Sequence, residues 1–292
     1  MLDSQDVDCV KVYNNVPEES LIAICEEAHS AGLLVLGYVP RSVSMTRAVA
    51  IGMDCLEHIR ITGRELLSQE EADKVDYLPL GVRETLLWEQ FDLESEGMQN
   101  VIQMLADTKV FLDPTLIVDA DMFAGGVEDG RASETEAMLP EPTLEALRKD
   151  RHLDPLRAPD DLQEKSLAGF EKRLQFIDQC NAAGVRILTG TDTFGPGALL
   201  PGASLHNELV LLQRAGLSPL EVLRAATETA ASALRREKDR GALEAGKVAD
   251  IVVLDADPLA DARNLRSIRM IVKDGREYTP PSLIHLAGNG YA

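Results

Sequence analysis

The sequence predicts an α/β fold organised around a parallel β-sheet. Short apolar runs, as long as buried strands, alternate with longer segments whose apolar residues recur at the helical period. The connections between these segments are short, as in consecutive βαβ units. In addition, the run GVRILTGTDT at 184–193 places glycines around a buried apolar strand that ends near Asp192. With 292 residues, 45% of them hydrophobic, the chain can bury one large core or two domains.

The first third of the chain is expected to contain three strands and two helices. Val10 and Val12 flank Lys11, so the lysine side chain points to the opposite face of its strand. The first helix has acidic residues in its first turn and Gly32 as its stop. The expected order is strand 8–13, helix 17–31, strand 33–37, helix 44–51 and strand 53–57.

The middle of the chain is less regular but continues this alternation. Helical pieces over 65–105 are interrupted at Pro79 and Gly81, and a stretch at 117–161 is rich in Asp, Glu and Pro. A stretch of that length is typical of a lid or an insertion. The other expected elements are strand 109–112, helix 162–183, strand 185–189, helix 204–215 and a helix from Ser218 to about Leu234.

The composition changes at Gly241, where short β segments separated by turn signals begin. The pair Asp274-Gly275 favours a hairpin between two of them. We therefore expect one domain over 1–240 with an insertion near 117–161, a small β segment over 241–279, and a loose tail over 280–292.

Charge and cysteine content indicate which binding partners and which cellular compartment to expect. The chain has 29 basic and 49 acidic residues, a net charge of -20, which argues against nucleic-acid binding and against anionic membranes. No apolar run reaches the roughly 18 residues of a membrane span. The four cysteines are scattered and the N-terminus has no signal-peptide pattern, so we expect a cytoplasmic protein with reduced thiols.

The ends of the predicted strands deliver Lys11, Tyr38, His58 and Asp192. Parallel strands end at one edge of a sheet, so these side chains can converge there. His and Asp are ligands for zinc-like ions, and an Asp beside a metal-bound water can take its proton. The alternatives remain open at this point: Asp192 could cap a turn, Lys11 could face solvent or an acid, and His58 could be a hydrogen-bonded core residue.

Five sequence blocks, in this order, carry a resemblance to a known family. They are GMDCLEHI at 52–59, FLDPTL at 111–116, GTDT at 190–193, PGASLHNELVLLQRAGLSPLEVLRAAT at 201–227 and GALEAGKVADIVVLDADPL at 241–259. From about Val7 to Tyr278 the chain resembles the C-terminal two-thirds of an amidohydrolase-superfamily enzyme. The most similar subgroup holds the imidazolonepropionase-like and Xaa-Pro dipeptidase-like metal-dependent hydrolases.

This resemblance implies a partial TIM (β/α)8 barrel, about strands four to eight, plus the C-terminal part of a small β-sandwich domain. It implies one or two divalent metal ions, zinc by expectation, at the C-terminal face. Lys11 matches a carboxylated-lysine ligand, His58 a histidine ligand, and Asp192 a ligand that is also the general base. His206 matches a histidine near the mouth of the site. Tyr38 stands in GYVP where the subgroup has GHVP, and is expected to line the substrate site.

The resemblance leaves two function hypotheses and a question about the chain's extent. The first is a hydrolase of carbon–nitrogen bonds in a small amide, cyclic amide or dipeptide, acting through a metal-activated water. The alternative is a catalytically inactive, truncated remnant without metal and with a structural or interaction role, because a strand-one His-x-His motif has no counterpart. Exposed strand edges would then favour a homo-oligomer. A third expectation is that the missing strands are encoded upstream.

Overall fold

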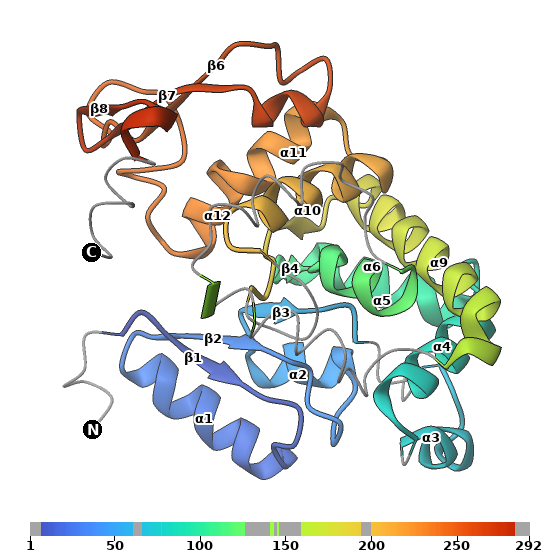
Figure 1. Ribbon diagram of the computed structural model, residues 1–292. Helices are drawn as coiled ribbons and strands as arrows, with labels where there is room; N and C mark the ends of the chain where they lie inside the picture. Colours follow the sequence, from blue (N-terminus) through green and yellow to red (C-terminus); the bar gives the residue numbers. More distant parts are fainter. Residues whose placement is uncertain are drawn as a thin grey trace.

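The computed structural model describes residues 7–60, 66–76, 78–125, 141–142, 145, 159–193 and 200–283. Its central feature is a five-stranded sheet in which consecutive strands are neighbours and every pair is parallel (Figure 1). The predicted α/β class with a parallel sheet is confirmed. The strands are β1 (Cys9–Val12), β2 (Leu34–Gly37), β3 (Cys55–Glu57), β4 (Phe111–Asp113) and β5 (Arg186–Ile187).

The two faces of this sheet differ in chemistry because side chains alternate along each strand. One row of cross-strand partners is apolar and buried. It consists of Val12, Leu56, Leu112 and Ile187, with Gly37 between the first two. Its neighbouring row consists of Lys11, Leu36, Cys55, Phe111 and Arg186. The apolar row belongs to the main hydrophobic core, and the expected orientation of Lys11 away from that core is confirmed.

The helices between the strands supply the rest of that core. In α1 (Glu18–Ser30) the residues Leu21, Cys25 and Ala28 are buried, which is the spacing of one helical face. Ser44 caps α2 (Met45–Ile51), and Ser95 caps α5 (Glu96–Thr108). Figure 1 shows α1 and α2 on the same side of β1 and β2.

The helical region after β3 is interrupted at one of the two predicted positions. Pro79 does separate α3 (Gln69–Asp76) from α4 (Leu80–Gln90), but Gly81 lies inside α4 and is buried, so the predicted interruption there is wrong. Helix α4 packs against α9 (Gln163–Ala182), and this tertiary contact outweighs the low helix propensity of glycine.

The stretch predicted as an insertion at 117–161 begins as ordered core. Helix α6 (Leu116–Phe123) is buried along most of its length and belongs to the main core. Most of the stretch beyond 125 lies outside the described residues, and the chain resumes with a short 3-10 helix, η2 (Asp160–Leu162), before α9. Residues 284–292 of the predicted tail also lie outside the described residues.

The described C-terminal part contains α10, α11 and α12, followed by a second sheet. Helix α10 (Ala203–Arg214) is followed by α11 (Pro219–Ala226), which Ser218 and Glu221 start with a capping box as predicted. The expected single helix to Leu234 is broken at Thr227, where α12 (Glu228–Ala233) begins, because the backbone of Thr227 is not helical.

A second, antiparallel sheet follows these helices in chain order. It comprises β6 (Ile251–Leu254), β7 (Ile268–Lys273) and β8 (Arg276–Tyr278), with a short 3-10 helix, η3 (Ala262–Arg266), between the first two. Asp274 and Gly275 connect β7 to β8 with positive φ at both residues, which confirms the predicted hairpin. No helix in the described part of the chain has the length and apolar character to cross a membrane.

Candidate active site

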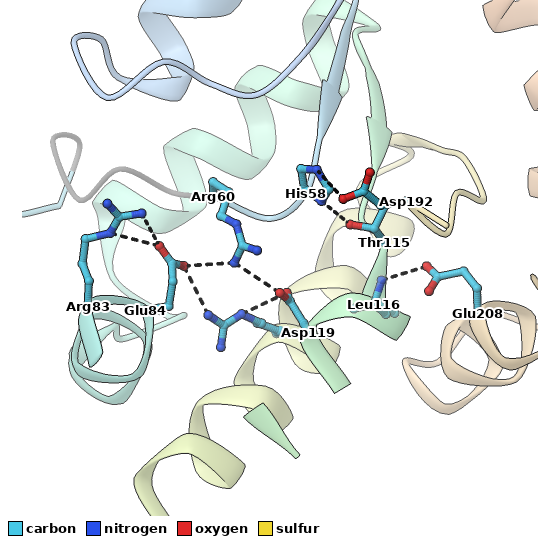
Figure 2. A network of polar contacts seen from close by, with 10 residues as sticks. His58, Arg60, Arg83, Glu84, Thr115, Leu116, Asp119, Asp192 and Glu208 are labelled. Atoms are coloured by element: carbon cyan, nitrogen blue, oxygen red, sulfur yellow. Dashed lines mark hydrogen bonds and ion pairs between the residues drawn. The ribbon is translucent and has the colours of Figure 1, made fainter. Parts of the chain in front are cut away.

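Polar side chains gather at the C-terminal edge of the five-stranded sheet. Tyr38 directly follows β2 and His58 directly follows β3, while Asp113 is the last residue of β4. Asp192 lies beyond the end of β5 and approaches His58 (Figure 2). Because all five strands run in the same direction, residues distant in sequence meet at this edge.

His58 is buried and held in one orientation. Its side chain is only 2% exposed, and its Nδ1 lies 2.5 Å from Thr115 Oγ1. Burial, and then the positive charges of Arg60 and Lys11, lower the pKa of His58 to about 3. The imidazole is therefore neutral at pH 7, and with its proton on Nδ1 it presents the lone pair of Nε2. That Nε2 atom is buried and has no hydrogen-bond partner among the described residues.

Asp192 faces this free nitrogen. Its Oδ2 lies 3.9 Å from His58 Nε2, and its side chain is 28% exposed. Burial raises the pKa of Asp192, against the opposing charges of Lys11 and Arg60. His58, Thr115 and Asp192 have φ angles of 64°, 45° and 46°, in a left-handed region that non-glycine residues rarely adopt. Strained backbone of this kind is found most often at functional sites, where it fixes the orientation of a side chain.

Lys11 is engaged by a neighbouring acid. Its Nζ lies 2.5 Å from Glu57 Oε2, and the two side chains are 45% and 16% exposed. Burial lowers the pKa of Lys11, but the hydrogen bond and charge of Glu57 outweigh it and raise the pKa overall. Lys11 is thus an ammonium in this arrangement, with three donors and no lone pair for a metal ion.

Asp113 is a buried acid that the sequence analysis did not single out. Burial, followed by the negative charge of Glu57, raises the pKa of Asp113 to about 7. Gly190 makes room for it, because a Cβ on that residue would lie 2.0 Å from Asp113 Oδ2. The backbone oxygen of Asp113 also accepts a hydrogen bond from His58 N at 2.8 Å. Its position in the FLDPTL block, one residue past the predicted strand, was the available signal.

Tyr38 forms part of an aromatic stack at the same edge. Its ring centroid lies 4.4 Å from that of His58 and 4.5 Å from that of Tyr13. Burial, with a hydrogen bond to Tyr13, raises the pKa of Tyr38 well above its usual range. The phenol therefore stays protonated and is a poor metal ligand. Tyr13, which was not predicted as a site residue, extends this aromatic wall.

Helix α10 contributes a positioning contact beneath the site. Glu208 is fully buried and accepts hydrogen bonds from Leu116 N at 3.0 Å and Ile117 N at 2.6 Å. Its carboxylate thereby caps the N-terminus of α6 and fixes the residue before it, Thr115, which contacts His58 (Figure 2). His206 lies on the same helix, two residues earlier, and is half-buried.

A cluster of buried charges lies beside the site. We call it the buried charge cluster; it consists of Arg173 and of the residues Arg60, Arg83, Glu84 and Asp119, which are labelled in Figure 2. Asp119 pairs with Arg60 and with Arg173, in each case at 3.2 Å. Glu84 pairs with Arg83 at 3.1 Å, Arg173 at 3.3 Å and Arg60 at 3.6 Å. Arg60 follows His58 by two residues, and Asp119 lies in α6, which follows Thr115. These ion pairs therefore connect the segment after β3 and helix α6 to α4 and α9.

Comparison with known proteins identifies the family. The model of the amidohydrolase family matches residues 15–278. The chain belongs to the amidohydrolase family. Adenine deaminase 4 of Rhizobium meliloti (strain 1021) is 26% identical over 153 residues, which are 52% of this chain and 23% of that protein.

Two solved amidohydrolase-like structures share the fold. A bottromycin amidohydrolase superposes with a TM-score of 0.72 at 24% identity, covering 97% of this chain and 60% of its own. A Xaa-Pro dipeptidase superposes with a TM-score of 0.58 at 17% identity, covering 94% of this chain and 55% of its own. This chain therefore spans little more than half the length of these structures, and less than a quarter of the curated relative.

The amidohydrolase family generally uses divalent metal ions, and the side chains present fit such an ion in part. His58 Nε2 and the Asp192 carboxylate are two suitable donors facing each other. Within the described ranges, no group of three His, Cys, Asp or Glu side chains is placed to hold a metal ion. Lys11 would supply a third donor if its Nζ were carboxylated to a carbamate, and its ion pair with Glu57 opposes that modification.

Proposed function

We propose that this chain carries part of the active site of a hydrolase that cleaves carbon–nitrogen bonds in small amide substrates. The observation that carries this proposal is the facing pair of His58 and Asp192. A neutral, buried imidazole presents an unpartnered Nε2 to a carboxylate across 3.9 Å, at the C-terminal edge of a parallel sheet. Family membership supports the same reaction class.

The proposal includes an architecture for the whole barrel. The five parallel strands in consecutive order correspond to strands four to eight of a (β/α)8 barrel over residues 1–240. The antiparallel sheet of β6, β7 and β8 corresponds to part of a small β domain over 241–279. We also propose that the protein is located in a reducing compartment such as the cytoplasm, because its four cysteines are free thiols.

His58, Asp192 and a carboxylated Lys11 are the residues we assign to a divalent ion, with zinc suited to nitrogen and carboxylate donors. Such an ion supplies a polarised carbonyl and a water of lowered pKa when bound. Asp192 takes the proton of the attacking water and delivers it to the leaving nitrogen, as the carbon–oxygen bond forms and the carbon–nitrogen bond breaks. Tyr38 and His206 are assigned to the substrate side of the site.

The test is hydrolysis by the purified protein of a panel of Xaa-Pro dipeptides, N-acyl amino acids, cyclic amides and aminopurines. We expect at least one class to be cleaved with zinc and not with excess chelator. Asp192→Asn should reduce the rate by about 10²-fold or more, the size of a general acid–base contribution. Asp107→Asn, an exposed change on α5, should leave it unaltered. Equal rates for wild type and Asp192→Asn would contradict the assignment.

A second candidate function is a non-catalytic, metal-free protein that acts by association. Two observations favour it: the Lys11–Glu57 ion pair, and Tyr38 with its raised pKa at a strand end where the subgroup has histidine. The edge strands β1 and β5 would then be pairing surfaces for a second copy. Light scattering after size-exclusion chromatography separates the candidates, since a zinc-independent oligomer without amide hydrolysis favours this one.

A further inference from the structure

A cavity of about 430 Å³ lies at the edge of the five-stranded sheet opposite the candidate active site. It is lined by residues at or before the beginnings of strands, including Leu34, Asp54, Phe111 and Arg186. Parts of α2, α5 and α12 complete its walls. Its volume is within the range of cavities that hold small molecules. Nothing in the proposed hydrolysis uses this cavity.

The charged side chains of this cavity are mostly basic. They are the cations Lys109, Arg186 and Arg235, with Asp54 as the acid among the lining residues. The carboxylate of Asp54 is already engaged, because its Oδ2 accepts from Val35 N at 2.8 Å and contacts His29 Nε2 at 2.9 Å. In a chain with a net charge of -20, a cavity with this balance is suited to an anion.

Arg186 is the residue that gives the cavity its chemical character. Its Nε is buried without a hydrogen-bond partner, and within the described ranges its guanidinium makes no ion pair with a carboxylate. The guanidinium carbon lies 3.8 Å from the centroid of the Phe111 ring. Stacking on a buried ring holds a planar fork of donors in one orientation, which matches the paired oxygens of phosphate or carboxylate.

Two further cationic residues of the cavity have left-handed backbone conformations. Lys109 follows α5 and Arg235 follows α12, and both have φ of 56°, a conformation in which glycine is favoured after a helix. Arg235 Nη1 donates to Gly32 O at 2.8 Å, so its side chain is partly fixed. These two residues and Arg186 come from separate elements and reach one cavity.

We infer that this cavity binds a small molecule through an oxyanion group, phosphate or carboxylate, held by the Arg186 guanidinium with Lys109 and Arg235 as supporting cations. The site is independent of the zinc-dependent reaction proposed above. It gives the protein a ligand-binding function at the edge of the sheet opposite His58 and Asp192.

Isothermal titration calorimetry with inorganic phosphate tests this inference, with chelator present and ionic strength held constant with sodium chloride. We expect saturable binding of one phosphate per chain, weakened roughly tenfold or more in Arg186→Gln, because charged hydrogen bonds are lost. Arg276→Gln removes the same charge from exposed β8, outside the cavity, and should bind as the wild type does. A parallel titration with acetate shows whether carboxylate is preferred over phosphate.

Asp192→Asn provides the second control, because it alters the candidate active site alone and should leave phosphate affinity unchanged. Should Arg186→Gln fail to fold by circular dichroism, the double variant Lys109→Gln/Arg235→Gln takes its place with the same expectation. Absence of saturable binding of either anion would overturn the inference. Equal affinities of wild type and the folded cavity variant would also overturn it.

Discussion

His58 Nε2 lies 3.9 Å from Asp192 Oδ2, while His58 Nδ1 contacts Thr115 Oγ1 at 2.5 Å. One side of the imidazole is thus fixed by a hydroxyl and the other is left open toward a carboxylate. All three residues have left-handed backbone, so the loops after β3, β4 and β5 are strained together at this point. A hydrogen bond on one ring nitrogen sets which nitrogen is free to bind, and orients the ring.

Thr115→Val should weaken both the fold and the site. Loss of the hydroxyl leaves His58 Nδ1 buried without a partner, which costs about 1–3 kcal/mol of unfolding free energy. Urea denaturation measures this cost. Thr108→Val, an exposed change on α5, is the control and should stay within about 0.5 kcal/mol. Equal stabilities of the two variants would show that the Thr115 contact does not hold His58.

Asp113 should make stability depend on pH in an unusual direction. Its folded-state pKa of about 7 lies above the ordinary value of 3.8, so between these values the native state keeps a proton that the unfolded chain has lost. The unfolding free energy attributable to Asp113 therefore falls as pH rises through this window, by up to about 1.4 kcal/mol per unit.

Chelator-treated Asp113→Asn lacks this titration. Subtracting its unfolding free energy from that of the wild type should give a larger value at pH 4.5 than at pH 7. The His58 titration, whose sign is opposite because its pKa is lowered to about 3, is present in both proteins and cancels. A difference that is flat, or that grows with pH, would contradict the raised pKa of Asp113.

Glu57→Gln should make Lys11 easier to carboxylate. The wild-type ion pair at 2.5 Å keeps Lys11 as an ammonium, whereas carboxylation requires the neutral amine and places a second negative charge beside Glu57. With ¹³C-labelled bicarbonate and zinc, a carbamate signal in the carbon NMR spectrum should be stronger in Glu57→Gln than in wild type. It should vanish in Glu57→Gln/Lys11→Arg. Equal signals in wild type and Glu57→Gln would remove Glu57 as the obstacle.

Local signals explain most of what the sequence could predict about the fold. Strands β1, β2 and β3 lie within their predicted ranges, because Gly32 and the Ser44 cap mark helix ends through short-range geometry. The continuation of α4 through Gly81 was missed, since α4 packs against α9 and this glycine is buried. The break at Thr227, whose backbone is not helical, was missed as well. Strand β5 is shorter than predicted because only Arg186 and Ile187 pair with β4.

The candidate site was predictable only where a residue stands at a strand end. Lys11, His58 and Asp192 carry that signal in the sequence itself. The contacts that define their chemistry are long-range: Lys11 with Glu57, His58 with Thr115, and the cap that Glu208 provides from α10. Such pairings depend on the folded arrangement, and a single sequence gives no spacing rule for them.

Arg173→Met should destabilise the protein far more than loss of an exposed arginine. Arg173 is fully buried, pairs with Glu84 and Asp119, and lies over the Trp88 ring at 4.7 Å. Removing one partner of a buried charge network costs about 3–5 kcal/mol. Arg214→Met removes an exposed pair with Glu171 and should cost about 1 kcal/mol or less. Chemical denaturation compares the two, and similar losses would contradict a structural role for the buried charge cluster.

The central claim is that His58 and Asp192 form a metal-binding pair, and zinc affinity tests it most directly. The affinity is measured by competition with a chromogenic chelator for wild type, His58→Gln and Asp192→Asn. The facing donors predict one zinc ion per chain in the wild type. Each variant should lose at least tenfold in affinity, because a donor on either side of the 3.9 Å gap is removed. Asp107→Asn should bind as the wild type does. A wild-type protein that binds no zinc, or variants that bind it equally well, would contradict the assignment of His58 and Asp192 as a metal-binding pair.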